Sequence, residues 1–275
     1  MTPPRTALVT GSTDGLGLQV ARRLAEAGFT VLIHGRNRER GEGVVRDIRS
    51  AGGSAQFHPA DLSSLEQVRR LADDVLREHG RLDLLINNAG IGTGGRGLTR
   101  ATSVEGYELR FAVNYLAGFL LAHRLVALLK QSSPARLINV ASAAQYPLDF
   151  GNVMLTRAFS GMRAYAQSKL AQVMFTFDLA RELQGAGVTV NCLHPASLMD
   201  TRMVRESGMK PASSVDEGSE AVLHLASSPV LSTHTGLYFY GMRPTRAHDQ
   251  AYDESARMNL RQLSRELVGL PPLPP

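Results

Sequence analysis

Residues 10–17 read Thr10-Gly11-Ser12-Thr13-Asp14-Gly15-Leu16-Gly17. A short apolar run over 6–10 leads into this stretch, and a segment with helical periodicity over 16–27 follows it. Glycines between a strand and a helix allow a tight turn and a close approach of the backbone to a ligand. The helix that follows presents unpaired N–H groups to an anion. The stretch predicts a strand–turn–helix unit that binds a dinucleotide pyrophosphate. A loop that only turns the chain is the alternative.

The same alternation continues along the chain. Apolar runs over 6–10, 30–35, 55–58, 82–87, 135–140, 188–194 and 236–240 alternate with helix-like segments near 16–27, 38–51, 63–79, 103–131, 161–184 and 216–227. Such alternation predicts right-handed crossovers and a parallel sheet covered on both faces. We therefore expect an α/β fold with a Rossmann-type doubly wound parallel sheet of about seven strands in three α/β/α layers. Ser63 and Glu66 predict a capping box for the third helix. One domain over 1–275 accounts for the length, and its Pro-rich end over 270–275 is expected to fray.

Composition excludes several classes of protein. Hydrophobic residues make up 43% and charged residues 20% of the chain, as in soluble globular proteins. The net charge of +5 is scattered without a basic stripe, which argues against nucleic-acid binding. The apolar run over 116–129, interrupted by His123 and Arg124, is interpreted as a core helix rather than a membrane span. The start of the chain lacks a signal-peptide pattern, and the single cysteine, Cys192, fits a reducing compartment. We expect a soluble, cytoplasmic protein.

Polar motifs follow four of the expected strands. Residues 11–17 follow the first strand, 87–90 the fourth, Ser142 the fifth and 194–201 the sixth. Ligands of doubly wound sheets bind at the carboxyl ends of the strands. These motifs are therefore expected to gather at one edge of the sheet.

The motifs resemble those of the short-chain dehydrogenase/reductase family over about residues 5–241. The spacing Thr-Gly-x-x-x-Gly-x-Gly is joined by Asp61-Leu62, Asn87-Asn88-Ala89-Gly90, Asn114, Ser142 and Tyr165-Ala-Gln-Ser-Lys169. The resemblance implies an enzyme that transfers hydride between a nicotinamide cofactor and a carbonyl or alcohol. It places Asp61 and Leu62 at the adenine, 88–90 at the adenosine ribose and Thr201 near the nicotinamide carboxamide. Asp61 could equally be an ordinary residue at a helix start. The expected cofactor contacts are Gly11, Ser12, Thr13, Asp14, Gly15, Leu16, Gly17, Arg36, Asp61, Leu62, Asn88, Ala89, Gly90, Tyr165, Lys169 and Thr201.

The end of the second strand indicates which cofactor binds. It reads Val-Leu-Ile-His-Gly-Arg over 31–36, with Gly35 where an NAD enzyme usually carries an acid. A glycine leaves room, and the Arg36 guanidinium can pair with a 2′-phosphate. Arg38 and Arg40 can add to the positive field. The prediction is NADP(H) in preference to NAD(H). The alternative is that these arginines are ordinary surface residues at the start of a helix.

Tyr165 and Lys169 lie four residues apart and so share one face of the expected helix. A free tyrosine has a pKa near 10, and lowering it by about three units needs about 4 kcal/mol. We expect the Lys169 ammonium to contribute to this shift. By resemblance, Tyr165 is the acid–base, Ser142 binds the substrate oxygen and Lys169 holds the nicotinamide ribose. Asn114 would link Lys169 to a relay water, or else be a satisfied core residue.

Two segments depart from the family pattern. Residues 143–160 make the distance from Ser142 to Tyr165 longer than usual, which resembles the retinol dehydrogenase branch and leaves Ser160 or Tyr146 as alternatives to Ser142. Residues 197–215 contain several methionines and are expected to form a substrate lid or a plain surface loop.

The predicted partner is therefore a small carbonyl or alcohol substrate of hydrophobic character. A homodimer or homotetramer through 103–131 and 161–184 is possible. No metal site is predicted. The alternative function is a catalytically silent NADP(H)-binding regulatory protein, and a sugar-nucleotide epimerase of the extended relatives is disfavoured by the glycine spacing.

Overall fold

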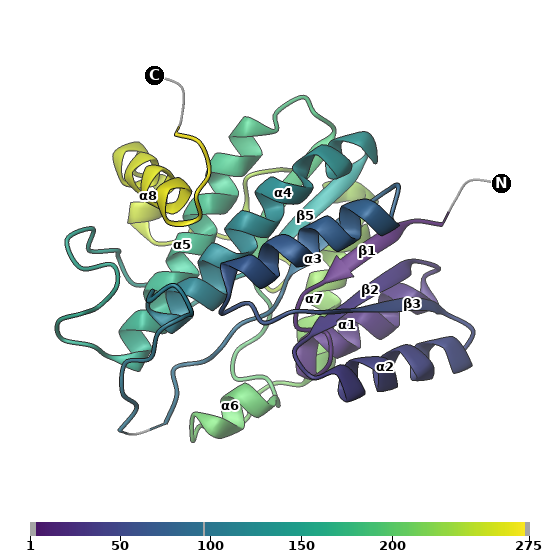
Figure 1. Cartoon of the computed structure of the whole chain (residues 1–275), viewed down its shortest axis with the longest axis horizontal. Helices are drawn as coiled ribbons and strands as arrows, with labels where there is room; N and C mark the ends of the chain where they lie inside the picture. Colours follow the sequence, from purple (N-terminus) through teal and green to yellow (C-terminus); the bar gives the residue numbers. More distant parts are fainter. Residues whose placement is uncertain (1–3, 96, 273–275) are drawn as a thin grey trace.

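An eight-stranded sheet runs through the middle of the chain, as seen in a computed structural model that describes residues 4–95 and 97–272 (Figure 1). The strand order is β3–β2–β1–β4–β5–β6–β7–β8. Seven strands pair in parallel, and the two-residue β8 pairs antiparallel with β7. The strands are β1 (Thr6–Val9), β2 (Thr30–Gly35), β3 (Ser54–Pro59), β4 (Leu84–Asn87), β5 (Ala135–Val140), β6 (Val188–His194), β7 (Tyr238–Tyr240) and β8 (Arg243–Pro244). The doubly wound α/β fold is confirmed, with one edge strand more than expected.

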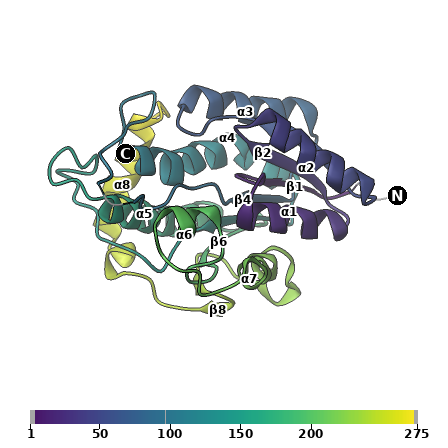
Figure 2. The ribbon, with the colours of Figure 1, turned by 90° about the horizontal axis from the view of Figure 1, so that it is seen from below.

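Helices cover both faces of this sheet, so that two separate apolar cores form (Figure 2). One core lies under α1 (Gly15–Glu26), α2 (Arg38–Ser50) and α7 (Val215–Ser227). The other lies under α3 (Leu65–Glu78), α4 (Ala117–Gln131) and α5 (Gly161–Glu182). The short α6 (Arg202–Glu206) and the C-terminal α8 (Glu254–Leu267) complete the helices that concern the site. The three expected layers are present, and of the Pro-rich end only 273–275 lies outside the described residues.

Two helix starts differ from the sequence prediction. The helix expected from residue 103 begins with a π-helical segment, η1 (Phe111–Leu116), and continues as α4. The segment before it instead forms a bridge between Thr102 and Glu108, and the buried Glu108 carboxylate accepts a hydrogen bond from the Phe111 amide at 2.8 Å. Helix α3 is capped by Ser64, one residue after the serine that the capping-box pattern indicated.

The apolar segment Phe111–Gln131 is long and apolar enough to cross a membrane by length and composition, with a mean hydropathy of 1.6 over its most apolar window. This helical segment is longer than the interrupted run that the sequence suggested. Two thirds of that window (67%) is buried inside the fold, against α3 and α5. Its burial agrees with the interpretation as a core helix.

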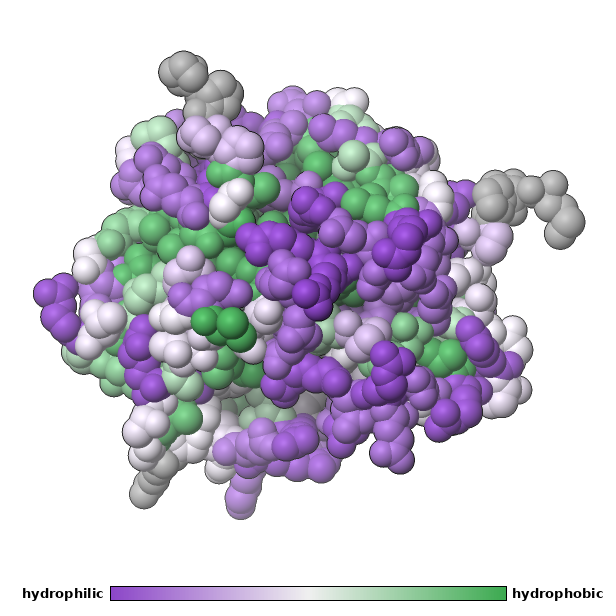
Figure 3. Space-filling model, in the orientation of Figure 1, coloured by the Kyte–Doolittle hydropathy of each residue, from purple (hydrophilic) through white to green (hydrophobic). Residues whose placement is uncertain are grey.

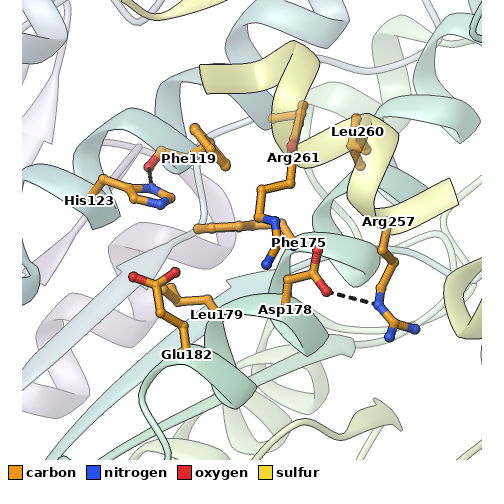
Figure 4. Close-up of a pocket in the computed structure, with 10 residues that line it drawn as sticks. Phe119, His123, Phe175, Asp178, Leu179, Glu182, Arg257, Leu260 and Arg261 are labelled. Atoms are coloured by element: carbon orange, nitrogen blue, oxygen red, sulfur yellow. Dashed lines mark hydrogen bonds and ion pairs between the residues drawn. The ribbon is translucent and has the colours of Figure 1, made fainter. Parts of the chain in front are cut away.

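Helix α8 packs across α5 and reaches α4 (Figure 4). The Tyr115 hydroxyl lies 2.6 Å from Ser264 Oγ, and Arg257 Nε pairs with Asp178 Oδ1 at 2.9 Å. The cavity between these helices measures about 10 Å³, enough for about one water. Part of the surface that the sequence suggested as a dimer face is thus covered by α8 of the same chain.

In the space-filling view, apolar residues gather on the left of the face shown, where the loops before α4 and α5 lie (Figure 3).

Candidate active site

The glycine loop between β1 and α1 packs tightly against the segment that follows β4. Gly11 has φ +65°, and a Cβ there would lie 2.9 Å from the Cα atom of Ala89. A Cβ on Gly17 would lie 2.3 Å from the Gly11 carbonyl oxygen. The Thr10 hydroxyl joins the two segments by accepting from the amides of Asn88 and Ala89, both at 3.0 Å. The glycines are thus required by close backbone packing, which also leaves the amino end of α1 open.

Ser12 and Asp14 serve the loop itself. The Ser12 hydroxyl is buried, donates to the Val9 carbonyl at 2.7 Å and accepts from the His34 amide. The Ser12 amide donates to the His34 carbonyl. Both the amide and the hydroxyl of Ser12 are therefore hydrogen-bonded within the protein rather than directed at a ligand. The Asp14 carboxylate caps α1 by accepting from the Gly15 amide at 2.7 Å.

His34 is a loop-supporting residue that the sequence reasoning did not single out. Its Nδ1 accepts a hydrogen bond from the Gly11 amide at 3.0 Å. Burial lowers the pKa of His34 to about 4, so the ring is neutral and can accept this bond. Only the pairing of β1 with β2 brings His34 beside the loop, and no local pattern would have revealed it.

The predicted 2′-phosphate residues lie at the carboxyl end of β2. Arg36 is largely exposed, and its Nη1 lies 3.9 Å from Asp61 Oδ2. Arg40 lies 3.8 Å from the Asp14 carboxylate. A Cβ on Gly35 would lie 2.6 Å from Thr13 Cγ2, so the room beside this glycine is filled by Thr13. The absence of a side chain at 35 is therefore also a packing requirement.

An open cleft of about 580 Å³ separates the glycine loop from α6. Asp14 and Gly15 line it on one side, and Thr201, Arg202 and Arg205 line it on the other. Thr201 caps α6 and lies beside Gly15, where a Cβ would be 3.4 Å from its methyl group. The segment expected to be a lid, 197–215, therefore faces the predicted cofactor loop.

The remaining predicted cofactor residues divide into core and rim. Leu16 and Leu62 are buried in the two apolar cores. Asp61 Oδ1 accepts from the Ser63 amide at 2.9 Å, which is a helix-start role of the kind weighed for it. A Cβ on Gly90 would lie 3.6 Å from Lys169 Nζ, so the segment after β4 runs close to α5.

Tyr165, Lys169 and Ser142 come together between α5 and the end of β5. Ser142 and Lys169 are buried, and Tyr165 is partly exposed. Lys169 Nζ lies 5.8 Å from the centre of the Tyr165 ring and donates to the Val140 carbonyl at 2.7 Å and to Gln172 Oε1 at 2.8 Å. A hydrogen bond with Ser142 favours the phenolate of Tyr165. A phenol, a hydroxyl and an amine are thus gathered at the edge of the sheet where ligands bind.

Burial dominates the electrostatics of Tyr165 and Lys169. Burial raises the pKa of Tyr165, and the Ser142 hydrogen bond offsets only part of that increase. Burial also lowers the pKa of Lys169 to about 7, so its ammonium form is itself disfavoured. In this state of the protein the pKa of Tyr165 is raised because desolvation outweighs the hydrogen bond with Ser142, and the lowering of this pKa by Lys169 stays a prediction.

Asn114 lies in η1 and does not contact Lys169 in any hydrogen bond of the described residues. Its side chain accepts from the Ile91 amide at 2.8 Å and donates to the Ile91 carbonyl at 3.1 Å. It also donates to Ser168 Oγ at 2.9 Å. Asn114 thus joins the segment after β4 to α5, which fits the alternative of a satisfied core asparagine.

The two alternatives to Ser142 occupy other positions. Ser160 caps α5 by accepting from the Arg163 amide, and Tyr146 is exposed with the Arg163 guanidinium 5.2 Å from its ring centre. Ser142 is the hydroxyl that hydrogen-bonds Tyr165. The longer loop over 143–160 therefore leaves Ser142 in its expected place.

A further polar group at the end of β6 was not assigned a role from the sequence. His194 lies 3.0 Å from Ser197 Oγ, which lies 3.0 Å from the Tyr240 hydroxyl. Burial, with a smaller contribution from the charge of Lys169, lowers the pKa of His194. Its position directly after a strand was the available signal.

Comparison with known proteins agrees with this geometry. A family profile described as short chain dehydrogenase matches residues 5–212. The chain belongs to the short-chain dehydrogenase/reductase family. Human "Retinol dehydrogenase 13" is 35% identical over 290 residues, which covers 98% of this chain and 86% of that protein. A solved structure of an uncharacterised protein from Mycobacterium paratuberculosis matches with a TM-score of 0.81 at 29% identity, covering 98% of this chain and 95% of that one.

Two other similar proteins have been solved with different nicotinamide cofactors. A short-chain dehydrogenase from Burkholderia cenocepacia in complex with NADP has a TM-score of 0.70 at 28% identity, covering 86% of this chain and 95% of that chain. A 3-ketoacyl-(acyl-carrier-protein) reductase from Brucella melitensis with NADH has a TM-score of 0.69 at 27% identity, covering 86% of this chain and 97% of that chain. The resemblance found in the sequence is confirmed, including its retinol dehydrogenase branch. The protein is an oxidoreductase of a family that binds nicotinamide cofactors.

Proposed function

We propose that this oxidoreductase transfers hydride between NADP(H) and an apolar ketone, aldehyde or secondary alcohol, with Tyr165 as the acid–base. One observation carries the proposal: Tyr165, Ser142 and Lys169 converge at the carboxyl edge of the sheet, next to the segment that follows β4. A surface tyrosine beside a surface lysine would not share a buried site with a third polar residue.

The residues present fit a dinucleotide. The glycine loop leaves the amino end of α1 open towards the cleft, because Thr201 alone among the described residues comes within 4 Å of a Cβ placed on Gly15. The loop amides and the helix end would hold the pyrophosphate, and Gly90 and Lys169 would approach the nicotinamide ribose. When bound, the cofactor supplies the hydride donor or acceptor.

The side chains of the protein manage the proton and the substrate oxygen. A raised pKa keeps Tyr165 a neutral phenol at neutral pH, which is the form that donates a proton to an oxygen gaining negative charge. Ser142 would donate a second hydrogen bond to that oxygen. Lys169 positions the site from the interior, where it is anchored to Val140 and Gln172.

NADP(H) preference rests on the basic end of β2. Arg36, Arg38 and Arg40 follow each other closely, and Arg36 is exposed enough to meet a phosphate. The carboxylate of Asp61 already lies 3.9 Å from Arg36, which holds the guanidinium near the expected adenosine side. A charge-assisted hydrogen bond is worth about 1.5–3 kcal/mol, or roughly 10–100-fold in affinity.

Fluorescence titration with NADPH and NADH tests this preference. Arg36→Ala should weaken NADPH binding at least about tenfold and leave NADH binding nearly unchanged. Arg46→Ala, on the exposed side of α2, is the matched control. Equal losses for both cofactors in Arg36→Ala would contradict the assignment of Arg36.

Apolar side chains around the start of α5 support an apolar substrate. Leu98, Tyr146 and Met162 are exposed there by 40%, 45% and 53%. Leu98 reaches Gly161, and Tyr146 lies beside Arg163. Met203, from α6, packs over Gly92 on the segment after β4, where a Cβ would lie 2.7 Å from Met203 Cγ. Some relatives are named retinol dehydrogenases, after an apolar alcohol, which is in keeping with these exposed apolar side chains.

A panel of carbonyl substrates with NADPH separates the enzyme from a silent cofactor-binding protein. Wild type should reduce at least some long-chain aldehydes or ketones, while Tyr165→Phe should bind NADPH normally and lose turnover by about 10²–10⁴-fold. Normal turnover in the phenylalanine variant would assign the proton to another residue. Normal NADPH binding without any turnover by wild type, across carbonyls and alcohols, would favour the regulatory alternative.

A further inference from the structure

Two histidines and a carboxylate meet outside the site described above, where β3 packs on the end of α3. His58 lies on β3 and is only 4% exposed. Glu78 is the last residue of α3, and His79 is its C-cap. One possible ligand atom from each of the three residues lies within 4.8 Å of the other two. Imidazole and carboxylate groups at this spacing are a donor set for a transition-metal ion.

The two histidines each carry an unsatisfied nitrogen. The Nε2 atoms of His58 and His79 are buried and have no hydrogen-bond partner among the residues that the structure describes. The rings meet edge to face with their centres 5.6 Å apart. A buried polar atom without a partner is destabilising, and most such atoms in folded proteins are paired. Two of them in adjacent rings point to a missing common partner.

We propose that His58, Glu78 and His79 bind one divalent transition-metal ion, with Zn²⁺ as the best fit. Zinc lies about 2.0–2.1 Å from imidazole nitrogens and about 2.0–2.2 Å from carboxylate oxygens, so tetrahedral ligand atoms are about 3.3 Å apart. The three ligand atoms therefore need to approach one another by at most about 1.5 Å, which side-chain rotation supplies. Water enters from the side of the exposed Glu78 and completes the coordination.

The neighbours of Glu78 both help and oppose this site. Gln56 Nε2 donates to Glu78 Oε2 at 2.5 Å, and Arg77 Nη2 donates to Oε1 at 3.0 Å. These bonds hold the carboxylate in place, and each oxygen keeps a second lone pair for an ion. The Arg77 charge repels a cation, so binding is weaker than in a site with four protein ligands. Mg²⁺ and Ca²⁺ are excluded as good occupants because they prefer sites built from oxygen alone.

The consequence of occupancy is mechanical rather than catalytic. A metal ion here ties the edge strand β3, near its carboxyl end, to the carboxyl end of α3. His58 is the register partner of His34, which supports the glycine loop through the Gly11 amide. Stabilising β3 therefore stabilises β2, which pairs with β1, the strand that leads into the glycine loop. No motif reveals this site in the sequence because 20 residues separate its two halves.

Isothermal titration of tag-free full-length protein with ZnCl₂ and thermal melts at rising ZnCl₂ test the site. We expect one Zn²⁺ per chain, a saturable rise in the melting temperature, similar behaviour with NiCl₂, and none with MgCl₂. His58→Gln and His79→Gln should each weaken Zn²⁺ binding at least tenfold. Exposed His234, outside the cluster, provides the control His234→Gln, which should bind as wild type does.

Three results would overturn the proposal. They are no saturable Zn²⁺ binding by wild type, unchanged affinity in both cluster variants, and a loss in His234→Gln equal to theirs. If His58→Gln fails to fold, His79→Gln and the surface variant Glu78→Gln decide the outcome. Glu78→Gln keeps a side chain that can bond Gln56 but loses the carboxylate, so several-fold weaker binding is expected from it.

Discussion

Lys169→Met is predicted to remove an unusual pH dependence of stability. Burial holds the pKa of Lys169 at about 7, against an ordinary value of 10.5. Between these two values the unfolded chain carries a proton on this lysine that the folded chain has lost. The unfolding free energy therefore rises with pH across this window, at up to about 1.36 kcal/mol per pH unit.

The size of the effect follows from the two pKa values. From pH 7 to pH 9, the lysine should add about 2 kcal/mol to the unfolding free energy of wild type, somewhat less than the full slope because it is half protonated at pH 7. Lys169→Met fills a similar volume without a titrating group, so it should lose this increment. The variant also leaves Val140 and Gln172 without a donor, but that loss does not depend on pH.

Urea unfolding at pH 7, 8 and 9, followed by circular dichroism, measures the difference between wild type and variant at each pH. Buried histidines and other groups titrate in both proteins, so their contributions cancel in this difference. Lys130→Met, at an exposed lysine of α4, is the control and should show no such trend. A difference between wild type and Lys169→Met that stays constant within 0.5 kcal/mol (about a quarter of the expected change) would refute the burial argument.

Three further changes have expected outcomes. Gly17→Ala places a Cβ 2.3 Å from the Gly11 carbonyl oxygen, so it should lower the unfolding free energy by about 1–3 kcal/mol and weaken NADPH binding. The control Gly80→Ala has open space around its Cβ and should change neither quantity, as measured by urea unfolding and fluorescence titration. Ser142→Ala removes the hydrogen bond that favours the Tyr165 phenolate, so the alkaline limb of the kcat/KM profile should move to higher pH; an unmoved limb would separate Ser142 from that titration. Arg257→Met removes the ion-pair partner of the partly buried Asp178 carboxylate of α5 and should cost about 3 kcal/mol at pH 7 by urea unfolding, with a smaller loss near pH 5. Equal losses at both pH values would argue against an effect of the Asp178 charge.

Much of the fold was predictable because it depends on local patterns. Apolar runs mark the strands to within about two residues, since both faces of a parallel sheet are buried and the runs show no alternation. The start of α4 was not predictable, because a bridge between Thr102 and Glu108 and a buried carboxylate set it. The two residues of β8 carry no pattern of their own and pair only because β7 turns back at Gly241.

The candidate site divides in the same way. Tyr165 and Lys169 were predictable from their spacing on one helix, and Ser142 from its place after a strand. The contacts of Asn114 with Ile91 and Ser168, and of His34 with Gly11, depend on which strands become neighbours. The direction of the tyrosine pKa could not be read from spacing either, because it depends on how many protein atoms exclude water around the pair.

Helix α5 shows what it costs to bury polar side chains in a tightly packed core. Between 164 and 176 nearly every side chain is buried, including Gln167, Ser168, Lys169 and Thr176. Each of these four side chains donates a hydrogen bond within the protein, so each has a partner for at least one of its donor groups. An apolar helix would pack the same space at lower cost, but it could not hold an amine beside a phenol. The lowered pKa of Lys169 reflects that cost. If the difference in unfolding free energy between wild type and Lys169→Met does not change from pH 7 to pH 9, the amine is better solvated than its burial implies.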